Sequence, residues 1–166
     1  MVDLRLTLRP EAEGDLAFLA NLYRDTRRHE VAAWGWPPAQ EELFLTMQFE
    51  AQRRGYRQMY PNAMGRIVAV AETDAGRLLV NEESSAMRLI DIALLEEFRN
   101  RGIGTHLLTE LQQECDSRQV ALRLHVLAAS PARRLYRRMG FEEVGADEIY
   151  VQMERCPRPA SEGVLR

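Results

Sequence analysis

Two glycines close a charged turn in the middle of the chain, where an apolar strand gives way to a helix. The run Leu89–Leu95 is mostly apolar, Glu96–Arg101 is charged, and Gly102 and Gly104 stand at the start of an amphipathic stretch. Glycine lets the backbone curl with no Cβ in the way, and the first amides of a helix have no partner within it. Such amides and the helix dipole attract a phosphate group. Residues 99–104 are therefore predicted to hold a phosphate-bearing ligand through the main chain.

The spacing of the glycines discriminates among phosphate-binding loops. A P-loop needs Gly-Lys before Ser or Thr, whereas Gly104 is followed directly by Thr105. The dinucleotide pattern needs a third glycine, and Leu107 occupies that position. What fits is Arg-x-x-Gly-x-Gly, read as Arg99, Asn100, Arg101, Gly102, Ile103 and Gly104. Between a strand and a helix, this pattern resembles motif A of the GNAT superfamily of N-acetyltransferases, which grips the pyrophosphate of acetyl-CoA. An ordinary strand-to-helix turn is the alternative.

A segment near the C-terminus resembles the same family. From Ser130 to Phe141 the chain reads Ser-Pro-Ala-Arg-Arg-Leu-Tyr-Arg-Arg-Met-Gly-Phe. The family often carries Asn-Pro-Ala-x-x-Leu-Tyr-x-x-x-Gly-Phe, so Ser130 replaces an asparagine and puts one polar contact to CoA in doubt. The resemblance covers Met87 to Met153. The preceding half agrees only in the order of its elements.

The resemblance implies a role for each matched segment. The main chain around Ala93 would pair with the pantetheine arm, and the glycine loop would hold the pyrophosphate. Tyr136 would lie at the thioester sulfur and act as the acid for the departing thiolate; its alternative is a core aromatic. The implied cofactor-binding residues are Ile92, Ala93, Leu94, Arg99, Asn100, Arg101, Gly102, Ile103, Gly104, Thr105 and Ser130.

Acetyl transfer to an amine also needs a base, because a protonated amine cannot attack. His125 stands in Leu-His-Val, where the ribosomal-protein type of N-acetyltransferase, which this chain resembles, places a catalytic glutamate. Its imidazole, with an ordinary pKa of about 6.5, suits the role. Asp91 interrupts an apolar strand and is the other candidate, as base, amine anchor or partner of His125. If the two strand faces adjoin, Asp91 would raise the pKa of His125. A structural histidine and deprotonation by water stay open.

The N-terminal half is predicted from its hydrophobic periodicity. Leu4 to Arg9 alternates as a half-buried strand, and a helix follows from Glu11 with an apolar face that ends at Tyr23. Residues 24–38 are expected to form a loop, whose Trp34 and Trp36 either line a substrate pocket or plug one edge of the core. A second helix runs from Pro38 to about Gly55, with Leu43, Met47 and Ala51 at a spacing of four on its apolar face and Phe44 and Phe49 widening that face.

The remaining elements complete the sheet. Strands are expected at 65–73, 78–80, 87–95, 120–127, 141–144 and 149–153, with a hairpin turn at Asp74-Ala75-Gly76. Helices are expected from Ile103, with a face of Ile103, Leu107, Leu108, Leu111 and Cys115, and over 132–139, between Ser130 as N-cap and Gly140 as the residue after the C-cap. Together with the resemblance, these strands and helices predict an α/β fold of the α+β type: a GNAT-like mixed, mostly antiparallel sheet of six to seven strands flanked by about four helices.

Composition limits the class of protein. A chain of 166 residues, 46% hydrophobic and 28% charged, is expected to be one globular domain over 1–155 with a flexible tail over 156–166. The net charge of −3, without a basic block, argues against nucleic acid. Neither the two cysteines nor the three histidines have metal-ligand spacing. The charged N-terminus and the lack of a run of about 18 apolar residues favour a cytoplasmic protein away from membranes.

The sequence therefore predicts an acetyl-CoA-dependent N-acetyltransferase without a metal. The acetyl group would pass directly to a primary amine in a ternary complex. The acceptor, a small-molecule amine or a peptide amine, is not identified by the sequence, and a homodimer stays open. The alternatives are an acyl-CoA-binding sensor or assembly module of the same fold, without turnover, and a different nucleotide-phosphate binder.

Overall fold

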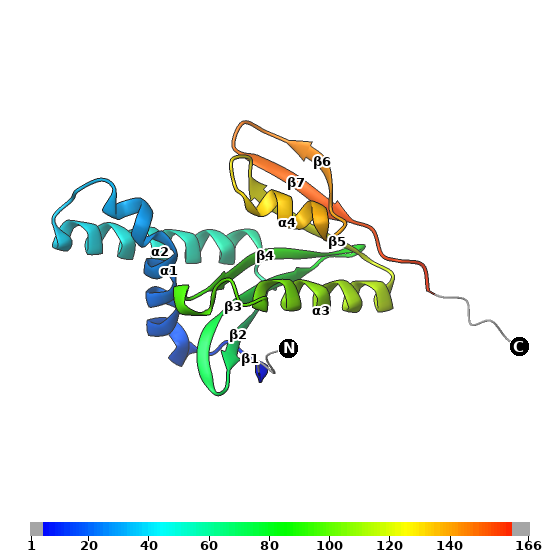
Figure 1. The fold of residues 1–166 in the computed structure, drawn as a ribbon, viewed down its shortest axis with the longest axis horizontal. Coiled ribbons are helices and arrows are strands. Elements are labelled where there is room, and N and C mark those ends of the chain that lie inside the picture. The colour runs from blue at the N-terminus through cyan, green and yellow to red at the C-terminus, as the bar shows by residue number, and fades with distance from the viewer. Residues whose placement is uncertain (1–4, 161–166) are drawn as a thin grey trace, which may run out of the picture. The chain divides into compact units, whose positions relative to one another are not determined.

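The structure is a computed structural model that describes residues 5–160 (Figure 1). It forms two compact units: the chain up to Leu79 with Asp91–Gly104, and Val80–Ile90 with the chain from Thr105 onward. The elements are β1 Leu6–Pro10, η1 Glu13–Asp15, α1 Leu16–Ala32, α2 Pro38–Met59, β2 Met64–Val70, β3 Thr73–Glu82, β4 Ala86–Leu94, η2 Glu96–Phe98, α3 Ile103–Arg118, β5 Ala121–Leu127, α4 Ala132–Arg138, β6 Glu142–Ala146 and β7 Tyr150–Arg155, where η marks a single 3-10 turn.

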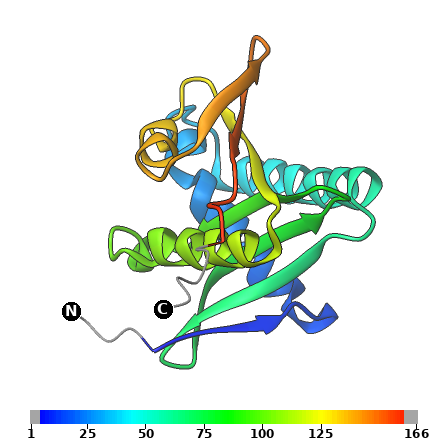
Figure 2. The ribbon, with the colours of Figure 1, turned by 90° about the vertical axis from the view of Figure 1, so that its right-hand side faces the viewer.

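The strands form a seven-stranded sheet in the order β1-β2-β3-β4-β5-β7-β6. Strands β4 and β5 pair in parallel, whereas β1 with β2, β5 with β7 and β6 with β7 pair antiparallel. Figure 2 shows β1 running beside β2. This mixed, mostly antiparallel sheet with four α-helices confirms the predicted fold class.

In the first unit, α1 is longer than predicted. The expected loop over 24–38 is wrong, because the helix continues to Ala32 and only residues 33–37 connect it to α2. Residues 24–32 contain three arginines, one glutamate and one alanine, which favour helix, and no glycine or proline. Leu22 and Val31, 3% and 1% exposed, bury both ends of this extension. Leu4, the first residue of the predicted N-terminal strand, lies outside the described residues.

The predicted buried face of α2 is correct for Phe49 but wrong for Leu43 and Met47. Leu43 and Met47 are 62% and 61% exposed, whereas Leu45 and Phe49 are buried. Two apolar stripes with a spacing of four compete in this sequence. The stripe that contains Phe49 faces inward, where it packs with Leu19, Leu22 and Ile67. Burial of the stripe with this large aromatic side chain removes more apolar area from water than burial of the alternative stripe would.

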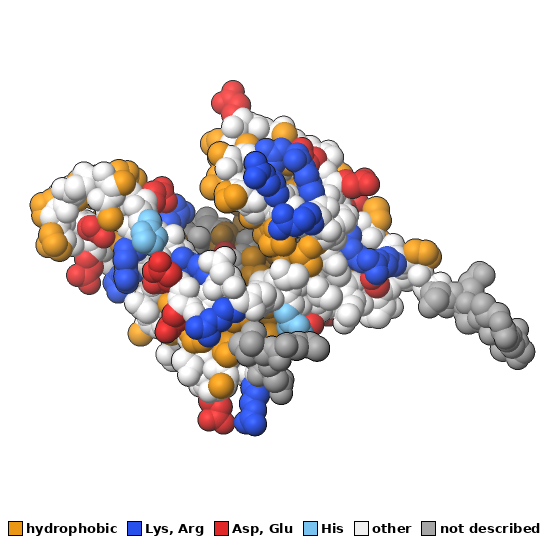
Figure 3. All heavy atoms as spheres, viewed as in Figure 1, with side chains coloured by type: hydrophobic (Ala, Val, Ile, Leu, Met, Phe, Trp, Pro, Cys, Tyr) orange, Lys and Arg blue, Asp and Glu red, His pale blue; other side chains and the backbone are white. Residues whose placement is uncertain are grey.

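The tip between α1 and α2 carries exposed aromatic side chains. The ring centroids of Trp34 and Trp36 are 5.0 Å apart, and Phe44 lies 5.4 Å and 5.3 Å from them. Figure 3 shows hydrophobic side chains gathered over this tip. Trp34 is 45% exposed, so it does not plug the core.

The turn between β2 and β3 falls earlier than predicted. Ala71 and Glu72 have φ angles of +47° and +70°, which is the pattern of a two-residue hairpin turn. Residues 74–76 belong instead to β3. A Cβ on Gly76 would lie 2.2 Å from the Ala93 carbonyl oxygen. This glycine therefore permits a close approach of two strands rather than a turn.

The second unit follows its predicted pattern closely. The face of α3 is buried as expected, with Ile103, Leu107, Leu108, Leu111 and Cys115 at most 2% exposed. Helix α4 ends as predicted at Gly140, where φ is +89°. The Gly140 amide donates to the Arg137 carbonyl at 3.1 Å, and the Phe141 amide donates to the Tyr136 carbonyl at 3.0 Å. Those two bonds define a Schellman cap.

The C-terminal segment is only partly described. Residues 156–160 form no helix or strand, but the Arg158 amide donates to Asp116 at 2.8 Å and its carbonyl accepts from Gln119 at 2.8 Å. Residues 161–166 of the predicted tail lie outside the described residues. Over 5–160, no helix combines the length and apolar character needed to cross a membrane.

Candidate active site

The glycine loop has the backbone conformation that its sequence predicts. After the turn η2, Asn100 and Gly102 adopt φ angles of +58° and +79°, and α3 begins at Ile103. A Cβ built on Gly102 or on Gly104 meets no atom within 4 Å. The space beside the loop is therefore open, as a main-chain site for an anion requires.

The side chain of Arg99 braces the loop from behind. Its Nε donates to the Leu94 carbonyl at 2.9 Å, and its Nη2 donates to Asp25 at 3.0 Å. Asp25, on α1, also accepts the Glu96 amide at 2.8 Å. Arg99 thus ties the end of β4 to α1.

Sequence reasoning missed Asp25. It lies 74 residues from Arg99, in a stretch of α1 that contains several other charged residues, so no local pattern singles it out. Its carboxylate is 11% exposed in side-chain area. A nearly buried carboxylate needs hydrogen-bond donors, and the turn after β4 supplies them.

Neighbouring contacts hold the rest of the loop. Phe98 is 8% exposed and anchors η2, and the Arg101 guanidinium lies over its ring at 5.5 Å from the centroid. Ile103 is 1% exposed, so its side chain is committed to the core. Thr105, the third residue of α3, is exposed.

The end of β4 provides the second part of the predicted site. The parallel register with β5 runs from the pair Ala86–Ala121 to the pair Leu89–Leu124 and does not include Ile92, Ala93 or Leu94. At the opposite edge, the Leu95 amide donates to the Ala75 carbonyl at 2.8 Å. Strand β3 thus occupies one edge of this stretch.

Asp91, one of the two candidate bases, is engaged by an arginine. The Arg77 Nη2 on β3 donates to its carboxylate at 3.0 Å. Arg77 is 7% exposed, and the Asp91 side chain is 27% exposed. The apolar strand therefore contains an aspartate because it neutralises a buried guanidinium.

His125, the other candidate base, lies on the exposed side of β5. It lines a cavity of about 250 Å³ together with Arg88, Arg123 and Gln152. Burial and the charge of Arg88 lower the pKa of its imidazole, while Asp147 and Glu83 act in the opposite direction. The predicted rise in the pKa is wrong, because desolvation and Arg88 prevail and Asp91 is committed to Arg77.

Tyr136 projects from α4, in the second unit. It is partly buried, and its ring packs edge-on against Phe141 with the centroids 5.6 Å apart. Just before the helix, Ser130 Oγ accepts the Ala132 amide at 3.2 Å, but the N-cap position is Pro131, one residue later than predicted. Figure 3 shows basic side chains over this helix, which contains Arg133, Arg134, Arg137 and Arg138.

Comparison with solved structures identifies the fold. The N-acetyltransferase PaiA of Thermoplasma acidophilum, in complex with coenzyme A, superposes with a TM-score of 0.69 at 18% identity, covering 92% of this chain and 99% of that one. The ribosomal-protein-S18-alanine N-acetyltransferase of Escherichia coli gives 0.61 at 22% identity over 97% and 99%. An acetyltransferase of Thermus thermophilus gives 0.67 at 18% identity over 94% and 99%. The fold is thus that of an acetyltransferase.

Sequence comparison gives the family. Residues 63–143, which include the glycine loop and α4, match the acetyltransferase (GNAT) domain. No curated protein matches the chain by sequence. Residues 63–143 therefore form an acetyltransferase (GNAT) domain, and the fold of the chain agrees with that of solved acetyltransferases.

Proposed function

We propose that this protein transfers an acetyl group from acetyl-CoA to a primary amine, by direct attack in a ternary complex. The loop from Arg99 to Gly104 is the observation that carries the proposal. Its glycines leave open space beside the first amides of α3, and it lies within the matched acetyltransferase domain. Acetyl-CoA, when bound, supplies the acyl group as a thioester.

The residues of the loop fit a pyrophosphate. The amides of residues 100–105 would donate to its oxygens at the positive end of α3. The edge of β4 at Ile92–Leu94, which is outside the β5 register, would pair with the amides of the pantetheine arm. The Ser130 hydroxyl accepts the Ala132 amide at the start of α4, so its contribution to the CoA site would be mainly structural.

Three groups would manage charge and protons during transfer. His125 would take the proton of the acceptor ammonium, for which its lowered pKa keeps the imidazole neutral at pH 7. A main-chain amide near Leu94 would donate to the carbonyl oxygen as negative charge develops. Tyr136 would protonate the departing thiolate, whose free pKa is about 8.5. Asp91 would serve as an anchor through Arg77 rather than as the base.

Calorimetry with CoA, acetyl-CoA, ATP and NAD tests the loop. We expect binding of the two CoA species and much weaker binding of the others. Gly104→Val should weaken CoA binding by about tenfold or more, because a branched side chain crowds the ligand. Apart from the chain neighbours and the backbone of its own helix, no protein atom lies within 4 Å of the added Cβ, so the variant should fold. Equal CoA affinity in both proteins would contradict the loop assignment.

Turnover tests the reaction itself. A screen of acetyl transfer to small amines, antibiotics, polyamines and peptide N-termini should show release of CoA that depends on the amine. CoA binding without transfer to any amine would favour the sensor or assembly module instead. The cytoplasmic location, the homodimer and the single domain stay predictions.

A further inference from the structure

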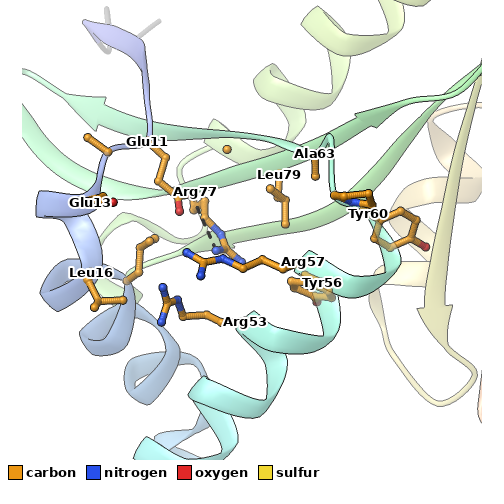
Figure 4. A pocket seen from close by; sticks show the side chains of 14 residues that line it. Glu11, Glu13, Leu16, Arg53, Tyr56, Arg57, Tyr60, Ala63, Arg77 and Leu79 are labelled. Carbon is orange, nitrogen blue, oxygen red and sulfur yellow. Dashed lines mark ion pairs between the residues drawn. The ribbon is translucent and has the colours of Figure 1, made fainter.

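The first unit contains a pocket that the proposed mechanism does not use. Its volume is about 740 Å³, and it is lined by the segment between β1 and η1, by η1, the start of α1, the C-terminal turns of α2, the connection from α2 to β2, and strands β2 and β3. Figure 4 shows that Arg53 and Arg57 from α2 and Arg77 from β3 point their guanidinium groups toward the same space. Leu16, Leu79, Tyr56 and Tyr60 give it apolar and aromatic walls.

Arg77 is the buried member of this trio. Its side chain is only 8% exposed, and its Nε is buried without a hydrogen-bond partner among the described residues. Nη2 donates to Asp91, whereas Nη1 is 3.9 Å from Glu11, beyond hydrogen-bond distance. Buried donors are nearly always paired, so this guanidinium has capacity for a further acceptor.

Among the described residues, the other two arginines differ, because Arg53 is in an ion pair and Arg57 is not. Arg53 is bonded through Nη1 to Glu50 at 3.1 Å, on its own helix. Within residues 5–160, the Arg57 side chain forms no hydrogen bond or ion pair. Like charges that converge repel one another, and an anion placed among them removes that repulsion. A planar guanidinium is the side chain best suited to a carboxylate.

A carboxylate of the protein marks the opposite side of the pocket. Glu11 lies against Gly65, where an added Cβ would approach its Oε2 to 2.2 Å. The Glu11 amide also donates to the Gly65 carbonyl at 2.9 Å. Gly65 therefore leaves the space in which Glu11 stands beside Arg77. The pocket thus offers both a basic wall and an acidic one, as a molecule with an amine and a carboxylate requires.

Arg77 links this pocket to the reaction. Its partner Asp91 precedes Ile92, the first residue of the main-chain edge assigned above to acetyl-CoA. We propose that the pocket binds the acceptor, and that this acceptor is an amine that also carries a carboxylate. The carboxylate lies among Arg53, Arg57 and Arg77, and an aromatic or apolar body lies between the tyrosines. This proposal rests on the proposed function for the identity of the ligand as acceptor.

Calorimetry on the protein saturated with CoA tests the proposal without turnover. The probes are tyrosine against tyrosinamide and alanyl-tyrosine against its C-terminal amide, so that each pair differs in one charge. The wild type should bind the carboxylate members about tenfold more tightly, which is the scale of one hydrogen bond to a charged group. Arg57→Gln should abolish this preference, while Arg54→Gln, an exposed neighbour outside the pocket, should retain it.

The outcomes separate the two proposals. Transfer or CoA binding without a carboxylate preference overturns the pocket assignment and leaves the acetyltransferase intact. A preference that survives Arg57→Gln overturns it as well. Inorganic phosphate that competes as well as the amino-carboxylates would define an anion site and overturn its role for the acceptor. Failure of CoA binding refutes the acetyltransferase, and the same pairs titrated into the free protein then decide whether the pocket prefers carboxylates.

Discussion

His125 is the proposed base, and the charge state of its imidazole decides how the rate depends on pH. Its folded-state pKa lies below the ordinary value of about 6.5, so the imidazole is already neutral at pH 7. If it is the base, kcat/KM rises with pH through an apparent pKa below about 6.5 and is level above it. The pH–rate profile of His125→Ala should lose this limb and show a lower plateau.

A charge variant gives the matched control. Arg88 lowers the pKa of His125, so Arg88→Gln should move the limb to higher pH. Asp147 acts oppositely, so Asp147→Asn should move it to lower pH. A limb that keeps its midpoint in all three variants would mean that His125 is structural and that water deprotonates the acceptor.

Tyr136 is the residue predicted to protonate the thiolate. Tyr136→Phe keeps the ring and its edge-on packing against Phe141, so the fold and CoA affinity should be unchanged. Loss of the hydroxyl should lower kcat by about 10²-fold, the usual scale for a general acid. Steady-state kinetics with acetyl-CoA measures this, and a kcat within about twofold of wild type at every pH would assign Tyr136 to packing.

At the scale of elements, α1 holds the end of β4 in place through Asp25. Asp25→Ala removes the acceptor for both the Glu96 amide and Arg99. Leaving these donors unpaired should cost about 1–3 kcal/mol of unfolding free energy. KM for acetyl-CoA should rise as the loop loses its brace, with a smaller effect in Asp25→Asn. Urea unfolding and kinetics measure both, with Glu30→Gln, an exposed change on the same helix, as control. Unchanged KM in Asp25→Ala would separate the brace from cofactor binding.

The approach of β3 to β4 depends on Gly76. Gly76→Ala would place a Cβ 2.2 Å from the Ala93 carbonyl oxygen, so the strands must move apart. We expect a loss of about 1–3 kcal/mol or more, as for other overpacked sites. Gly55→Ala, in α2 with open space around the Cβ, should instead stabilise by about 0.5–1 kcal/mol. Denaturant midpoints compare the two, and equal effects would show that strand approach is not limiting.

At the scale of the whole molecule, the sequence predicts those features that residues close together in the chain determine. The face of α3 and the cap of α4 follow from one apolar stripe and from one glycine with positive φ. The buried face of α2 does not follow from a local pattern. Two stripes satisfy the helical period, and only packing against α1 and β2 selects the one that contains Phe49. The turn predicted at Gly76 is wrong because the sequence shows a glycine but not the carbonyl that approaches it.

The candidate site divides in the same way. The glycine loop is encoded within a few consecutive residues and can be predicted from them. Asp25 on α1 bonds to Arg99 of the loop, 74 residues away in the sequence. Arg77 on β3 bonds to Asp91 on β4, 14 residues away. Such contacts are set by the fold, so they cannot be predicted from the spacing of residues along the chain.

The last prediction concerns the unfolding of the whole chain in acid. Each unit contains a carboxylate whose pKa is lowered by an arginine: Asp15, bonded to Arg9 and the Ala12 amide, in the first unit, and Asp116, bonded to Arg155 and the Arg158 amide, in the second. Each pKa is lower in the folded state than in the unfolded one. Their stabilisation is therefore complete above the unfolded value, about 3.8, and is lost as the pH falls through the folded value.

Asp15→Asn and Asp116→Asn should each lower the urea midpoint at pH 7. Near pH ~2, below the unfolded pKa of both carboxyls, the midpoints of the two variants should approach that of the wild type. The exposed control Glu142→Gln should leave the midpoint unchanged at both pH values. If the predicted single domain over 1–155 unfolds cooperatively, both variants shift the same transition, seen alike by tryptophan fluorescence and circular dichroism. The only tryptophans, Trp34 and Trp36, report on the first unit. Asp116→Asn would therefore leave fluorescence unchanged if the units unfolded independently, and that result would replace one domain with two.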